Sequence, residues 1–298
     1  MPRKFIRAAT VSERSESPKH YHMTRIANRW EQLRKQNAKA LIPFIMAGDP
    51  DIPKSIEVVL ALAEAGSDVI ELGVPFSEPI ADGPVVQRAG ERALKKGAYL
   101  PAILDMVRQI RRQSEVPLLL FSYLNPILRY GLERFAADAV AAGADGALIT
   151  DLSVEEAEPF VAGMRRQGLD TVFLAAPTST DERLRRVAEL STGFVYAITR
   201  MGVTGAREQL SDAIAPLVKR LRACTELPIA AGFGISRPEH LAALAPLVDG
   251  VVVGSALVRC LEEHADNPAP HVAEMARWLR EGFLQLDREK APGGMRSG

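Results

Sequence analysis

Cysteine is scarce in this chain of 298 residues, which has only Cys224 and Cys260. The two lack the spacing of a metal-binding motif, and two lone cysteines are typical of a protein from a reducing compartment. The amino-terminal segment is basic but has no apolar core of the kind that a secretory signal requires. We therefore expect a cytoplasmic protein without a disulfide framework.

Excess charge and long apolar runs are also missing. Lys and Arg together number 37, and so do Asp and Glu, so no net electrostatic field directs the chain toward nucleic acid or a membrane surface. No apolar run reaches the ~18 residues of a membrane span. Hydrophobic residues make up 47% of the sequence, which is enough for a large core. We expect a small-molecule substrate, with neither nucleic acid nor membrane as a partner.

Periodicity divides the chain into three parts. Residues 1–22 are polar and show no apolar period, which predicts a disordered extension. Residues 23–288 carry regular patterns without an interdomain linker, which predicts a single domain. Residues 289–298 are Gly-rich and are predicted to form a flexible tail.

Strand and helix patterns alternate through the central part. Thr24 is a candidate N-cap for a first helix with an apolar stripe of Ile26, Trp30 and Leu33. Strands are then predicted at residues 40–46, 68–72, 117–122, 146–150, 171–175, 193–198, 228–231 and 250–253, with helical patterns between them. Eight such units over about 250 residues predict an α/β fold, a (β/α)₈ TIM barrel with an extra amino-terminal helix that closes its bottom.

An open, doubly wound sheet is the alternative fold, because it is built from the same parallel units. No G-x-G-x-x-G fingerprint follows the first strand, which counts against a dinucleotide-binding fold.

The stretch IELGVPFSEPIADG, residues 70–83, contains two carboxylates in unusual places. Side chains alternate between the faces of a strand, so Glu71 lies opposite Ile70 and Leu72 and points into a closed barrel. A buried carboxylate costs several kcal/mol, in rough terms, unless it is paired or neutralised. Asp82 follows on the loop after this strand. We expect Glu71 to be functional, with a capping or ion-paired role as the alternative.

Active sites of TIM barrels form at the carboxyl ends of the strands. The first strand places Phe44 near this end, the third is followed by Tyr123, and the sixth carries Tyr196. The last three strands are followed by glycine-rich turns, in which backbone N–H groups can approach an anion closely. The candidate phosphate ligands in these turns are Gly205, Gly232, Gly234, Gly254 and Ser255, and Phe233 lies between two of the glycines.

Histidine and lysine are absent from these strand ends. A zinc-dependent lyase would need imidazole ligands there, and a Schiff-base aldolase would need a lysine. We therefore expect no metal, and proton transfer by carboxylates, with a tyrosine as a further candidate.

Several of these segments together resemble the tryptophan synthase alpha chain family. They are LIPFIMAGDPD, IELGVPFSEPIADGP, YLNPILRYG, ALITDLSVEE, GVTGAR and PIAAGFGIS. The resemblance covers residues 24–286, and the second segment is the most specific. It implies a lyase of tryptophan biosynthesis that cleaves indole-3-glycerol phosphate to indole and glyceraldehyde 3-phosphate. It also implies no cofactor on this chain and an α2β2 heterotetramer with a beta chain that holds pyridoxal phosphate.

The resemblance also assigns roles. It implies that Glu71 is the catalytic acid and base, that Asp82 holds the indole N–H, and that Tyr196 lies beside the substrate. Thr204 would meet Asp82 when its loop closes. Ring packing is implied for Phe44 and Phe233, and phosphate contacts for Gly205, Gly234, Gly254 and Ser255.

The chain departs from the family pattern at Glu78, where the family usually has Asp, and at Arg200-Met201 before the GVTG segment. The first lies on the loop expected to face the beta chain. Three other functions stay open at this point: a free-standing indole-releasing lyase, a different phosphate-binding TIM-barrel isomerase, and a catalytically weak barrel kept as an allosteric subunit.

Overall fold

The computed structural model describes residues 23–198, 207–232 and 234–290. Its strands are β1 (Ala40–Met46), β2 (Ile70–Gly73), β3 (Leu118–Ser122), β4 (Gly146–Ile149), β5 (Asp170–Ala175), β6 (Val195–Ile198), β7 (Ile229–Gly232) and β8 (Gly250–Val253). They pair in parallel in the order of the sequence, and β8 returns to β1 to close a barrel. The predicted TIM barrel is therefore confirmed, and the open sheet is excluded.

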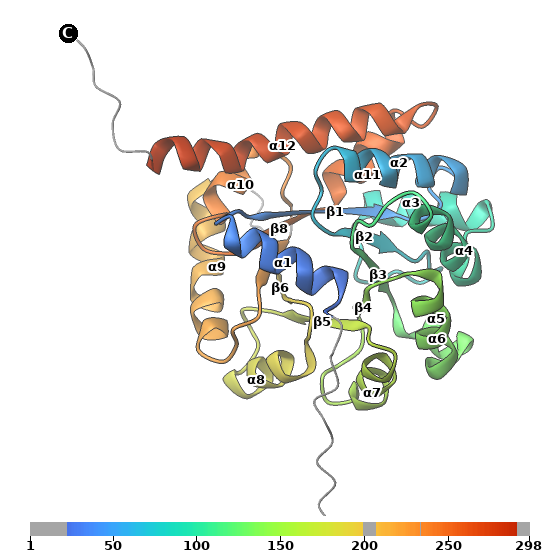
Figure 1. The fold of residues 1–298 in the computed structure, drawn as a ribbon, viewed down its shortest axis with the longest axis horizontal. Coiled ribbons are helices and arrows are strands. Elements are labelled where there is room, and N and C mark those ends of the chain that lie inside the picture. The colour runs from blue at the N-terminus through green and yellow to red at the C-terminus, as the bar shows by residue number, and fades with distance from the viewer. Residues whose placement is uncertain (1–22, 199–206, 233, 291–298) are drawn as a thin grey trace, which may run out of the picture.

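Helices surround this barrel (Figure 1). They are α1 (Arg25–Lys35), α2 (Ile52–Glu64), α3 (Pro84–Lys95), α4 (Leu100–Arg111), α5 (Leu124–Tyr130), α6 (Leu132–Ala142), α7 (Glu158–Arg166), α8 (Asp181–Leu190), α9 (Arg207–Arg222), α10 (Pro238–Leu244), α11 (Ser255–Glu263) and α12 (Pro268–Lys290). The sequence patterns did not predict α5 and α11.

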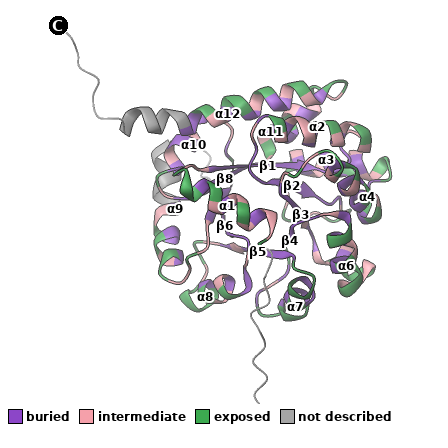
Figure 2. Ribbon diagram, viewed as in Figure 1, coloured by how far each residue is buried: buried purple, intermediate pink, exposed green. Residues whose placement is uncertain are grey.

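The pattern of buried residues matches this arrangement of a barrel surrounded by helices. All seven residues of β1 are buried, as are all four of β2, because both faces of each strand are covered. Figure 2 shows buried residues along the strands and on the inner sides of the helices. The core therefore lies both inside the barrel and between the barrel and its helices.

Helix α1 closes the amino-terminal end of the barrel, as predicted. The Thr24 hydroxyl accepts a hydrogen bond from Ala27 N at 3.1 Å and so caps the helix. The Trp30 ring lies 5.7 Å, centroid to centroid, from Phe194, just before β6. A Cβ at Gly250, the first residue of β8, would lie 2.7 Å from Trp30 Cη2, so only glycine lets this helix pack so closely.

The sequence predicts one apolar side for the last helix, formed by Val272, Met275, Trp278, Leu279, Phe283 and Leu286, and the structure differs from this prediction in one detail. Val272, Ala276, Leu279 and Phe283 are buried at spacings of four, three and four residues, which defines the inner face of α12. Trp278, expected on the same face, lies outside this stripe and is 43% exposed. Leu286, also expected there, lies outside the side chains that the structure describes.

Candidate active site

Glu71 points into the barrel from β2. Its neighbour on the same face, Gly73, lies so close to the Phe44 ring that an added Cβ would be 2.7 Å from Phe44 Cζ. The Glu71 side chain is fully buried, and neither carboxylate oxygen has a hydrogen-bond partner among the described residues. Burial raises the pKa of Glu71 to about 8. The alternative of a capping or ion-paired glutamate is therefore wrong for the described part of the chain.

Tyr196 faces the same interior from β6. Its side chain is 7% exposed, and burial raises its pKa well above 10, with the charge of Glu71 as a second cause. The phenol is therefore a neutral hydrogen-bond donor at physiological pH. Gly232 lies on β7 two residues beyond Ala230, the sheet partner of Tyr196, and has no room for a Cβ, which would overlap the Tyr196 hydroxyl. The missing side chain at Gly232 thus leaves room for the hydroxyl and the ring edge of Tyr196.

Asp82 lies on the loop between β2 and α3. The loop is fixed by backbone contacts, because Asp82 N donates to Pro79 O at 3.1 Å and Gln87 Nε2 donates to Asp82 O at 2.9 Å. The Asp82 side chain is half-buried. Burial raises its pKa to about 6, and the Tyr123 hydroxyl opposes this by favouring the ionised carboxylate.

Tyr123 follows β3 and contacts the loop between β2 and α3, which carries Asp82. Its hydroxyl accepts a hydrogen bond from Ala81 N at 3.0 Å, and its ring lies 5.3 Å from that of Phe76. The side chain is 3% exposed. Tyr123 therefore joins the third strand to the loop that carries Asp82.

Phe44 provides an apolar wall between the ends of β2 and β8. It is paired with Glu71 in the sheet and meets Phe121 edge-on at 5.2 Å between ring centroids. On the other side, a Cβ at Gly254 would lie 3.5 Å from Phe44 Cδ1. A flat apolar ring placed against Phe44 would thus lie beside both Glu71 and the turn after β8.

The predicted phosphate ligands that are described lie at the ends of β7 and β8. Gly234 is exposed and has a φ of +66°, which favours glycine. Gly254 is the N-cap residue of α11, and no side chain caps this helix. The first N–H groups of α11, starting at the exposed Ser255, are thus free of a side-chain cap. A helix start of this kind attracts anions.

Three predicted site residues, Thr204, Gly205 and Phe233, lie outside the described residues, as does Arg200-Met201. Two other polar residues follow the ends of β3 and β4. Asp151 is exposed and accepts a hydrogen bond from Leu124 N at 2.7 Å, and Asn125 is exposed on α5.

Some residues around the site were not predicted. Gln87 on α3 supports the Asp82 loop, and Asp49 after β1 is bound by Arg92. Asp49 and Arg92 are 43 residues apart, so their pairing leaves no local pattern in the sequence. Within the described ranges, no group of three or more His, Cys, Asp or Glu side chains is arranged to hold a metal ion.

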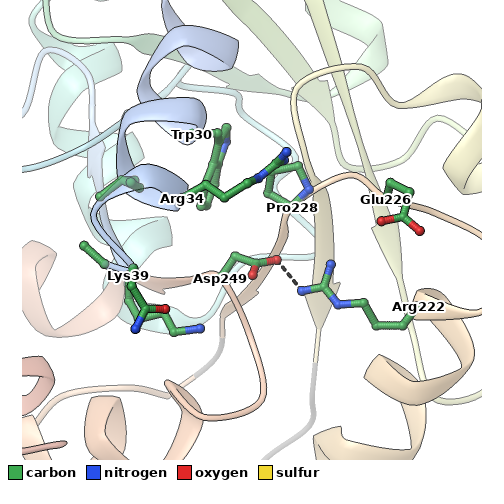
Figure 3. A pocket seen from close by; sticks show the side chains of 10 residues that line it. Trp30, Arg34, Lys39, Arg222, Glu226, Pro228 and Asp249 are labelled. Carbon is green, nitrogen blue, oxygen red and sulfur yellow. Dashed lines mark hydrogen bonds and ion pairs between the residues drawn. The ribbon is translucent and has the colours of Figure 1, made fainter. Parts of the chain in front are cut away.

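A cavity of about 310 Å³ lies at the opposite end of the barrel, beside α1 (Figure 3). Three of the charged side chains that line it, Arg222, Asp249 and Lys39, are bound to other groups of the protein. Arg222 pairs with Asp249, whose carboxylate also accepts a hydrogen bond from Ile229 N at 2.8 Å. Lys39 Nζ donates to Val248 O at 2.7 Å. The cavity contains none of the predicted site residues, so the candidate site stays at the carboxyl ends of the strands.

Of the helices that the structure describes, none is long and apolar enough to cross a membrane.

Comparisons with known proteins point to one family. The family model for the tryptophan synthase alpha chain matches residues 30–283. The tryptophan synthase alpha chain of Solibacter usitatus is 58% identical over 263 residues, which span 88% of this chain and 98% of that relative. The alpha chain of Geotalea uraniireducens is 52% identical over 241 residues, which span 81% and 90% of the two chains.

Solved structures give the same result. Tryptophan synthase subunit alpha from Legionella pneumophila superposes with a TM-score of 0.82 at 36% identity, covering 88% of this chain and 99% of that chain. A chain of the tryptophan synthase a2b2 complex from Pyrococcus furiosus superposes with a TM-score of 0.76 at 42% identity, covering 80% and 97%. The family model and these relatives span most of the sequence, and this chain belongs to the tryptophan synthase alpha chain family.

Proposed function

We propose that this chain cleaves indole-3-glycerol phosphate to indole and glyceraldehyde 3-phosphate, as the alpha subunit of a tryptophan synthase. One observation carries the proposal: Glu71 is fully buried at the carboxyl end of a barrel strand, without a hydrogen-bond partner in the described residues. A carboxyl group held there at an energetic cost is available for proton transfer. Membership of the tryptophan synthase alpha chain family supports this activity.

The reaction breaks the bond between the indole C3 atom and the neighbouring carbinol carbon. The indole C3 atom gains a proton, and the carbinol hydroxyl loses one as its carbon becomes an aldehyde. Glu71 has a pKa of about 8, so it is mostly protonated at neutral pH and can donate the first proton. The resulting carboxylate can accept the second proton, which restores the starting state. The substrate therefore gains one proton and loses one, and Glu71 ends in its starting protonation state.

Asp82 stabilises the intermediate in this scheme. Protonation at C3 makes the indole ring cationic, and a carboxylate that accepts a hydrogen bond from the ring N–H favours that form. The ionised form of Asp82 predominates above its pKa of about 6. Tyr196 lies beside the reacting carbons as a neutral donor, and Phe44 packs against the ring. We assign to Thr204, which lies outside the described residues, the contact with Asp82 that the family resemblance implies.

The phosphate binds at the other side of the barrel mouth. Gly234, Gly254 and Ser255, together with Gly205, contribute backbone N–H groups, and the start of α11 adds its dipole. We assign to Phe233, which lies outside the described residues, the ring-packing role that the family resemblance implies. This arrangement holds the anionic end while the ring faces Glu71 and Asp82.

The partner of this chain is the tryptophan synthase beta chain. A solved relative is the a2b2 complex of Pyrococcus furiosus. We place pyridoxal phosphate on the beta chain and no cofactor on this one, as the family resemblance implies. No lysine ends a barrel strand in this sequence, where it could form a Schiff base. We also place the protein in the cytoplasm, on the basis of its two lone cysteines.

The loop before Asp82 is suited to dock this partner. Ile80 is 87% exposed, and Ser77 and Glu78 are exposed beside it. A beta chain bound here would fix the loop and therefore Asp82. A free-standing lyase and a phosphate-sugar isomerase are not favoured, because the relatives are alpha chains of the two-subunit enzyme.

The test is indole release from indole-3-glycerol phosphate by the purified chain, alone and with saturating beta chain. We expect slow release alone and faster release in the complex, because ~1 Å of misplacement of a catalytic group costs ~10²-fold. Glu78→Ala should reduce the activation by the beta chain more than the basal rate, and Glu78→Asp should preserve it. Absence of indole in both arms would refute the proposed function.

A further inference from the structure

Four charged side chains form a continuous network behind the barrel mouth, which we call the charged bridge: Asp49, Arg88, Arg92 and Glu262. Arg92 Nε and Nη2 each donate to one carboxylate oxygen of Asp49 at 2.8 Å. The remaining Arg92 nitrogen, Nη1, donates to Glu262 Oε1 at 2.8 Å. Arg88, one turn earlier on α3, binds both oxygens of Glu262 at 2.8 and 2.7 Å.

The charged bridge ties together three elements of the candidate site. Asp49 lies just after β1, which carries Phe44. Arg88 and Arg92 lie on α3, which begins two residues after Asp82. Glu262 lies on α11, which begins at Ser255 on the phosphate side. Helix α11 packs on both α3 and β1, so the charged bridge links elements that are also in direct contact with each other.

Arg92 is the centre of the network. Asp49 is 1% exposed, and its charge has no other cation within ion-pair distance among the described residues. The Arg88 and Arg92 guanidinium groups hold the pKa of Glu262 at about 2, with the Arg88 hydrogen bonds as the largest cause. A planar guanidinium can bind Asp49 through two parallel bonds and still reach Glu262, which a lysine ammonium cannot.

The connection from α3 to Asp82 is short and direct. Gln87, next to Arg88 on the same helix, donates to the backbone oxygen of Asp82 at 2.9 Å. On the inner side, Gly90 packs on β1, where an added Cβ would lie 3.7 Å from Met46 Cε. A shift of α3 against β1 or α11 therefore moves the Asp82 backbone relative to the phosphate side.

We propose that Arg92 is a positioning residue, which sets the distance between Asp82 and the phosphate-binding start of α11 by holding α3 to both β1 and α11. The inference rests on the proposed function, because it concerns the distance between the parts of the site that bind the ring and the phosphate of one substrate. Arg92 touches no reacting atom and acts only through Asp82.

A double-mutant cycle separates this role from a general structural one. Arg92→Lys is measured in the wild-type and the Asp82→Asn background, as kcat and KM for indole release in the complex with saturating beta chain. With Asp82 present we expect kcat to fall about 10-fold or more, on the scale set by ~1 Å of misplacement. Without the Asp82 carboxylate, the same substitution should change the residual rate by about 2-fold or less, because coupled residues are not additive.

The inhibition constant of glycerol 3-phosphate, which probes the phosphate side alone, should change by less than about 3-fold, because the glycine turns are untouched.

Arg111→Lys is the matched control. Arg111 also binds a buried aspartate, Asp145, at 2.9 Å, but at the amino-terminal end of the barrel. It should lower the melting temperature and leave kcat unchanged in both backgrounds. If Arg92→Lys does not fold, Glu262→Gln replaces it, since Asp49 then keeps its arginine. It should lower kcat in the wild-type background only.

Equal rate losses in the two backgrounds, for either variant, would overturn the proposal, and so would an unchanged kcat in both. Failure of the proposed function looks different, because the wild-type complex would then release no indole.

Discussion

The Tyr123 hydroxyl accepts a hydrogen bond from the backbone N–H of Ala81, the residue before Asp82, at 3.0 Å. The phenol therefore bridges the third strand of the barrel and the loop of the second. Its own hydrogen remains available to the Asp82 carboxylate, and this neighbour opposes the rise of the Asp82 pKa. The Tyr123 hydroxyl oxygen thus affects both the position of the loop that carries Asp82 and the ionisation of the Asp82 carboxylate.

Removing that oxygen tests the relationship. Tyr123→Phe should lower kcat for indole release by about 10-fold, since the loop loses its anchor and misplacement is costly. The acidic limb of the pH–rate profile should also move to higher pH, because the interaction that lowers the Asp82 pKa is lost. Tyr130→Phe is the control, since Tyr130 donates to Asp138 outside the site. An acidic limb that stays in place, or moves to lower pH, would contradict the assignment.

Glu71 should make the stability of the protein depend on pH in a defined direction. Its pKa rises from 4.5 to about 8 on folding, so between these values the folded state holds a proton that the unfolded state has released. The stabilisation is complete below pH 4.5 and is lost as the pH rises through 8. At 1.36 kcal/mol per pKa unit, the change from 4.5 to about 8 amounts to about 5 kcal/mol.

Glu71→Gln removes this titration. The free energies of unfolding of the two proteins, from urea denaturation, should differ little near pH 4.5. The variant should become progressively more stable than the wild type up to about pH 8, and the difference should then stay constant at higher pH. A constant difference across this range would mean that Glu71 is not held in the protonated form by burial.

Gly232 should be indispensable for the position of Tyr196. In Gly232→Ala the new methyl group overlaps the Tyr196 hydroxyl, so the ring must move away from its place beside Glu71. We expect at least about a 10-fold loss of kcat/KM, on the scale of ~1 Å of misplacement. Gly163→Ala on α7 is the control, because an added Cβ there has no heavy atom within 4 Å. It should leave activity intact and stabilise the helix by roughly 0.5–1 kcal/mol. Equal activity of the two variants would refute the assignment.

Much of the fold is encoded in local patterns that a single sequence displays. The alternation of apolar runs and amphipathic stretches predicts the eight strands, and strand parity alone predicts that Glu71 faces inward. The position of Asp82 follows from the proline- and glycine-containing loop that must connect this strand to the next helix. The roles of Thr204, Gly205 and Phe233 stay predictions, because they lie outside the described residues.

Other features depend on contacts between distant segments. Arg92 and Glu262 are 170 residues apart in the chain, so nothing near either one indicates the pairing. The same is true of Tyr123 and Ala81, which are 42 residues apart. The exposure of Trp278 follows from how α12 packs on α2 and α10, which the apolar composition of the helix does not determine.

The most direct test is the turnover number of Glu71→Gln for indole release from indole-3-glycerol phosphate, with saturating beta chain at neutral pH. Loss of general acid–base catalysis predicts a fall of at least ~10²-fold, and a larger one if the same group transfers both protons. Glycerol 3-phosphate should still bind, and the melting temperature should be no lower than that of the wild type. Near-normal turnover by a folded Glu71→Gln variant would contradict the account.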